Sequence, residues 1–151
     1  MAAALFWSLV LVCCGYGAAY GGRDGRRLAV IYVLACLLTV VASRLDHDWA
    51  RTQPWVMAVD LLLMVALVWL ALRSSRWFPI WFAGFHLVAV ASHLASAVAP
   101  GFATKIYFLL QALWSIPMLL VFAIGVTIDR QAGVVDDAAA GVDPVGDGPA
   151  T

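Results

Sequence analysis

The sequence contains no glutamate, a single lysine and few charged residues of any kind. Charged residues make up 12% of the chain, whereas a soluble domain carries about 25%. The formal net charge is +0, so no basic surface is available to bind nucleic acid. Hydrophobic residues make up 64% of the chain, and the mean hydropathy is +0.94. This composition excludes an ordinary soluble domain and predicts an all-α, polytopic integral membrane protein.

Cysteine is scarce and odd in number, and Cys13 and Cys14 are adjacent, so we expect no disulfide framework. The chain has no phosphate-binding glycine loop, no paired carboxylates within an apolar segment and no catalytic triad at a plausible depth. We therefore expect a protein that is not an enzyme. The scarcity of lysine beside abundant arginine, alanine and glycine is typical of a GC-rich bacterial genome, which favours a bacterial inner membrane.

Five apolar segments predict five transmembrane helices in a small bundle, which forms a domain over residues 1–130. The segment 21–27 is predicted as a flexible basic turn. Pro117 lacks an N–H group and is expected to interrupt the last span. A signal peptide requires Lys or Arg before its apolar run, and neither precedes the first apolar run here. We therefore expect this span to be retained. The predicted spans are 2–20, 28–43, 55–72, 77–98 and 103–128.

Two polar segments lie outside the spans. Residues 131–151 consist mainly of Ala, Gly, Val, Pro and Asp, so we predict a disordered acidic tail, with a partner-docking segment as the alternative. The loop between the second and third spans carries Asp46, His47 and Asp48. Three adjacent ligands rarely converge on one metal ion, so we expect a solvated loop and no metal site.

Basic residues in the loops predict the topology. Six arginines fall on one side of the membrane, and three basic residues fall on the other. The side with more positive charge is normally cytoplasmic, which places the N-terminus outside and the C-terminus inside. The first side receives Arg23, Arg26, Arg27, Arg73, Arg76 and Arg130; the second receives Arg44, Arg51 and Lys105.

Ionisable residues inside apolar spans are costly and mark the first place to look for function. Asp60 and His93 both lie about 7–8 Å from the outer surface, counted at 1.5 Å per residue. Because a tight turn joins their spans, we expect antiparallel packing and an Asp60–His93 pair. His86 and Ser115 lie about 18 Å deep, and Gln111 lies about 12 Å deep. These five residues form a candidate polar seam from the outer surface to the middle of the membrane.

The seam has two interpretations. Its residues either hold helices together by hydrogen bonds, which we favour, or form a path for a proton or cation. Haem is not expected, because His86 and His93 share one face of one helix and cannot ligate opposite sides of one iron. We expect no cofactor. The aromatic cluster of Trp69, Trp77, Phe78, Trp81, Phe82 and Phe85 is predicted as an interface belt facing lipid, with a ligand or partner groove as the alternative.

The sequence therefore predicts a small non-enzymatic protein of the lipid bilayer. Its expected role is that of an accessory or interaction subunit of a larger membrane complex, or of a homo-oligomer. The alternative is a small channel or transporter that moves a proton or cation along the seam. An intramembrane enzyme is the third reading.

Overall fold

The computed structural model describes residues 2–45, 54–98 and 104–133, with side chains described for residues 4–44, 54–95 and 113–133. These residues form five α-helices, and the described part contains no strand. The predicted all-α class is therefore confirmed for the described residues. The helices are α1 (Ala2–Tyr20), α2 (Gly22–Leu45), α3 (Pro54–Arg73), α4 (Phe78–Val98) and α5 (Thr104–Gln131).

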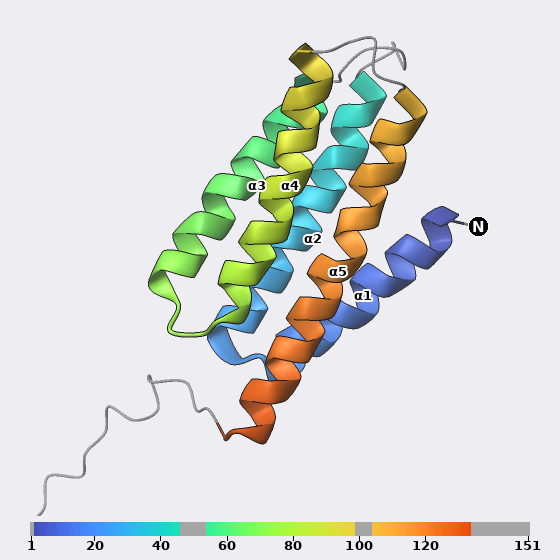
Figure 1. Ribbon diagram of the computed structural model, residues 1–151. Coiled ribbons are helices and arrows are strands. Elements are labelled where there is room, and N and C mark those ends of the chain that lie inside the picture. The colour runs from blue at the N-terminus through green and yellow to red at the C-terminus, as the bar shows by residue number, and fades with distance from the viewer. Residues whose placement is uncertain (1, 46–53, 99–103, 134–151) are drawn as a thin grey trace, which may run out of the picture.

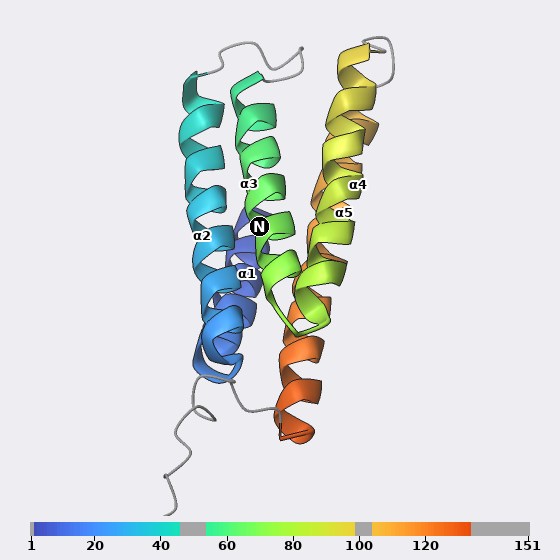
Figure 2. The same cartoon turned by 90° about the vertical axis from the view of Figure 1, so that its left-hand side faces the viewer.

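Helices α2 to α5 run up and down as a bundle, and each packs against a neighbour in the chain (Figure 1). Helix α1 packs against α2 and also against α5, so the first and last helices meet. Figures 1 and 2 both show α1 inclined to the other four helices. Its first turn lies beside the middle of the bundle rather than at the end that the other helices reach.

Four helices are long and apolar enough to cross a membrane, judged by length and composition. They are α2, α3, α4 and α5, which correspond to four of the five predicted spans. The described part of α1 is also apolar but is shorter, and it is not among the four. Large apolar side chains on the outward faces are widely exposed, as Val65 and Leu72 show at 67% and 82%. Such a surface suits lipid and identifies the chain as a membrane protein.

The beginning of α2 differs from the prediction. The segment 21–27 was expected as a flexible turn, yet only Gly21 separates α1 from α2, and α2 begins at Gly22. Gly22 has a positive φ of 64°, which lets the chain reverse within one residue. Asp24 then lies in the first turn of α2, where a carboxylate is favourable beside the helix dipole. The span predicted as 28–43 is therefore part of a helix of 24 residues.

Helix α5 also differs from the prediction, because it continues through Pro117 without a break. The missing N–H of Pro117 costs one hydrogen bond, but the flanking turns remain packed against α4 and α1. At its other end, Gly133 adopts a positive φ of 67°, a common way to end a helix. The predicted tail lies almost wholly outside the described residues, as do Asp46, His47 and Asp48.

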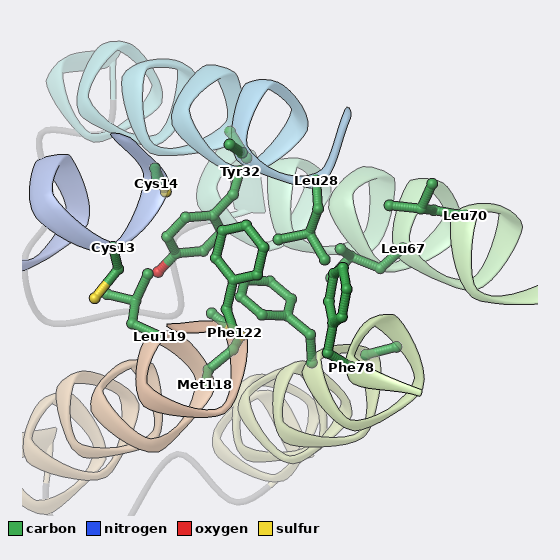
Figure 3. Packing of buried hydrophobic residues seen from close by; sticks show 14 of the residues in the cluster. Cys13, Cys14, Leu28, Tyr32, Leu67, Leu70, Phe78, Met118, Leu119 and Phe122 are labelled. Atoms are coloured by element: carbon green, nitrogen blue, oxygen red, sulfur yellow. The ribbon is translucent and has the colours of Figure 1, made fainter. Parts of the chain in front are cut away.

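The core is aromatic. Phe78 and Phe82 of α4 and Phe122 of α5 are fully buried. Figure 3 shows Phe78, Phe122 and Tyr32 of α2 in this core. Tyr32 packs edge-on against Phe82 with ring centroids 5.2 Å apart. Phe78 and Phe122 are 5.6 Å apart. Phe78 and Phe82 were expected to face lipid, and that expectation is wrong. Their place in the chain near a helix end did not reveal that α2 and α5 cover them.

Glycines allow α1 to approach its neighbours. A Cβ added at Gly17 would overlap the ring of Phe122, and one added at Gly25 would lie 2.6 Å from the carbonyl oxygen of Gly17. Gly125 of α5 similarly faces the Cβ of Phe78. The backbones of α1 and α2 meet at Gly17 and Gly25, and phenylalanine side chains occupy the space beside Gly17 and Gly125. Small residues are therefore required there, as is common where membrane helices pack closely.

Replacing Gly17 with alanine is expected to destabilise the protein by about 1–2 kcal/mol, because the new methyl group must displace the buried Phe122 ring. Gly15→Ala is the matched control, since Gly15 is in the same helix and has nothing within 4 Å of an added Cβ. Thermal unfolding in a mild detergent measures both variants. Equal melting temperatures for Gly17→Ala and Gly15→Ala would contradict the close contact of α1 with α5.

Candidate functional site

The candidate site lies between α3 and α4. His93 Nε2 is 2.7 Å from Asp60 Oδ2, and both residues are buried. The predicted pairing of these residues is thus confirmed. Asp60 lies near the start of α3 and His93 near the end of α4, so antiparallel packing places them at one level.

His86 contacts the same residue from the other side. Its Nε2–H donates to the backbone carbonyl oxygen of Asp60 over 3.0 Å, and the ring is buried. Side chains lean toward the N-terminus of their helix, whereas carbonyl groups point toward its C-terminus. Asp60 therefore extends its carboxylate toward His93 and its carbonyl toward His86. Asp60 of α3 thus contacts two histidines of α4.

The other two residues of the predicted seam, Gln111 and Ser115, are on α5. Ser115 is half-buried on α5, and the side chain of Gln111 lies outside the described ones. Near His93 in the chain, Ser92 donates to the carbonyl oxygen of Val88 in its own helix. The contacts of Asp60 with His86 and His93 join three of the five residues, and the continuous seam stays a prediction.

A second buried ion pair was not predicted. Arg76 Nη1 is 3.0 Å from Asp129 Oδ2, and both side chains are less than 10% exposed. This pair joins the turn between α3 and α4 to the last turns of α5. Arg76 was counted only as a basic loop residue, and Asp129, which follows the last predicted span, was assigned no role. One indication of this pair was present in the sequence, namely that both residues were expected on the same side of the membrane.

Two further interactions tie the same end of the bundle together. The Ser74 hydroxyl donates to Asp24 Oδ2 over 2.5 Å, which links the α3–α4 turn to α2. The hydroxyls of Tyr16 and Thr127 are 3.1 Å apart, which links α1 to α5. Hydrogen bonds between helices at this end thus complement the contacts of Asp60, which lies toward the other end of α3.

Among the described residues, no group of three or more His, Cys, Asp or Glu side chains is arranged to hold a metal ion. Cys13 and Cys14 are buried free thiols on α1. The indole N–H of Trp114 is the one buried side-chain donor in the described part without a hydrogen-bond partner. Compared with known proteins, the chain matches no protein-family model, no curated sequence and no solved structure.

Proposed function

We propose that the chain is a small non-enzymatic protein of a bacterial inner membrane that acts as an accessory or interaction subunit. The observation that supports this proposal is that the buried charged side chains pair with one another across the bundle. Asp60 pairs with His93 and Arg76 pairs with Asp129, each time across two elements of the bundle. These groups stabilise the helix assembly, while the outward apolar faces remain for lipid, a membrane-protein partner or a second copy.

The proposed topology has five spans, with the N-terminus outside and the C-terminus in the cytoplasm. Helix α1 supplies the fifth span: its 19 residues correspond to about 28 Å of helix, and Leu5, Leu11 and Val12 expose apolar side chains. Because α1 is inclined, crossing requires the bilayer to thin around its first turn. An N-terminal tag should be reached by antibody from outside intact spheroplasts. A tag reached only after lysis would reduce the count to four spans.

The test of the accessory role is gentle purification of a tagged full-length chain from its native membrane, followed by mass spectrometry. We expect a partner at fixed stoichiometry, recovered again when the partner carries the tag, or a homo-oligomer of defined size. A monomer that binds neither itself nor another membrane protein would overturn the proposal. Cross-linking in whole membranes before solubilisation guards against loss of the partner in detergent.

A second function has one specific observation in its favour. Two histidines of α4 converge on Asp60, and histidine is the side chain that most readily exchanges protons near neutral pH. A proton or cation path through this group would show as flux in proteoliposomes that contain the purified chain. Flux that Asp60→Asn abolishes, in a protein that stays folded, would favour transport over the accessory role.

A further inference from the structure

We propose that one end of the bundle binds the phosphate groups of anionic phospholipids. This end, called here the arginine end, comprises the α1–α2 turn, the α3–α4 turn and the last turn of α5. Figure 1 shows these three segments together at the end opposite the last turn of α2 and the first turn of α3. The inference goes beyond the proposed accessory function, because it names a lipid ligand and holds whether or not a protein partner exists.

Positive charge dominates the arginine end. Among the described residues, six arginines and two aspartates lie at this end. Asp129 is already neutralised by the buried Arg76, and Asp24 accepts a hydrogen bond from Ser74. Arg27, which is exposed, lies 3.8 Å from Asp24. The exposed arginines of the arginine end are Arg23, Arg26, Arg27, Arg73 and Arg130.

Contacts between side chains connect the segments that carry these arginines. Arg76–Asp129 joins the α3–α4 turn to α5, and Asp24–Ser74 joins that turn to α2. The guanidinium of Arg130 lies 4.3 Å from the centroid of a ring of α1, that of Tyr20. All helix ends at this location are therefore tied to one another. Groups held in place by packing bind a ligand with a smaller loss of entropy than groups on free loops.

Aromatic side chains place the arginine end at headgroup depth. Arg73 lies over the ring of Trp69, with its guanidinium carbon 4.6 Å from the centroid. Tyr20, Trp69 and Trp81 expose 52%, 46% and 58% of their surface. Exposed Tyr and Trp are typical of the membrane–water interface. The guanidinium groups beside them therefore lie where lipid phosphates are concentrated.

Arginine is suited to this ligand, because its planar guanidinium donates paired hydrogen bonds to phosphate oxygens. A lipid that carries net negative charge gains more from this end than a zwitterionic lipid, whose choline group opposes the arginines. The acidic segment that follows α5 carries Asp136, Asp137, Asp143 and Asp147 and is the competing occupant. Lipid is favoured because exposed Tyr and Trp side chains beside the arginines are typical of the depth of the lipid headgroups.

The experiment uses the full-length chain in phosphatidylcholine bilayers and compares spin-labelled phosphatidylglycerol with spin-labelled phosphatidylcholine by electron paramagnetic resonance. One basic residue near a charged membrane surface corresponds to about a fivefold change in binding. We expect a preference for phosphatidylglycerol of about fivefold or more, which weakens at about 1 M salt. The variant Arg23→Gln/Arg26→Gln/Arg73→Gln should lose the preference.

The matched control, Arg44→Gln/Arg51→Gln/Lys105→Gln, removes equal charge outside the arginine end and should keep the preference. An unchanged preference in the arginine-end variant, with circular dichroism like that of the wild type, would overturn the proposal. Equal loss in both variants would overturn it too, since net charge alone would then explain binding. A preference that appears only when the four tail aspartates become asparagine would assign the arginines to the tail. Loss of the preference in excess inorganic phosphate would assign them to a soluble anion.

Discussion

Replacing Arg76 with methionine is expected to lower the free energy of unfolding by about 3–5 kcal/mol. Methionine preserves most of the length of the side chain but removes the charge that faces Asp129. The carboxylate of Asp129 is 9% exposed, so water cannot replace the guanidinium freely. A buried charge left without its partner is among the most destabilising changes that a single substitution can cause. The measurement is unfolding of the full-length protein in a mild neutral detergent.

A double-substitution cycle separates the pair from packing. If Arg76→Met acts by stranding Asp129, then Arg76→Met/Asp129→Leu should recover most of the lost stability, because neither charge remains. Arg73→Met is the matched control: Arg73 is three residues away and exposed, and its contact with Trp69 accounts for about 0.5–1 kcal/mol. Additive losses in the double variant would mean that the two side chains stabilise the protein independently and that the pair is not the cause.

The contrast between the two buried pairs shows which contacts a sequence can predict. Asp60 and His93 lie on helices joined by a short turn, so counting residues from that turn fixes their relative depth. Arg76 and Asp129 are also on one side of the membrane, but they are 53 residues apart. Their contact depends on α5 packing beside α4 and on the turn before α4 folding toward α5, neither of which loop charges or apolar lengths specify.

Local errors in the prediction have a similar origin. A search for apolar segments excludes Arg23 and Asp24 from a helix because they are charged, although both residues fit a first turn at the membrane surface. Phe78 and Phe82 were assigned to an interface belt because aromatic residues gather at membrane boundaries. Phe82 is buried against Tyr32 and Phe122, and Phe78 is buried against Gly125, whose missing side chain leaves room for it. The space is created by a residue almost fifty positions away, so the local pattern does not reveal it.

His93→Leu is expected to destabilise the protein by about 3 kcal/mol, because the Asp60 carboxylate then lies in an apolar interior without its partner. Asp60→Asn should cost less, about 1 kcal/mol, because the amide oxygen of asparagine can still accept a hydrogen bond from His93. The His86 bond is made to the backbone of residue 60 and should survive both substitutions. Unfolding in detergent measures the two losses. Equal losses would contradict the explanation that the larger loss in His93→Leu comes from the unpaired charge of Asp60.

The same two variants decide between the proposed functions when flux and assembly are measured beside stability. If Asp60 and His93 hold α3 and α4 together, Asp60→Asn should retain its partner or its oligomeric state below its lowered melting temperature, and wild-type proteoliposomes should show no proton or cation flux. If they carry a proton, the wild type should conduct, and Asp60→Asn should lose flux at temperatures where its helical content is intact. Asparagine is the informative substitution, because it nearly preserves the shape of the side chain and can still accept a hydrogen bond, while it removes the carboxylate. A loss of flux therefore cannot be attributed to a collapsed helix pair, and a loss of assembly cannot be attributed to the missing proton.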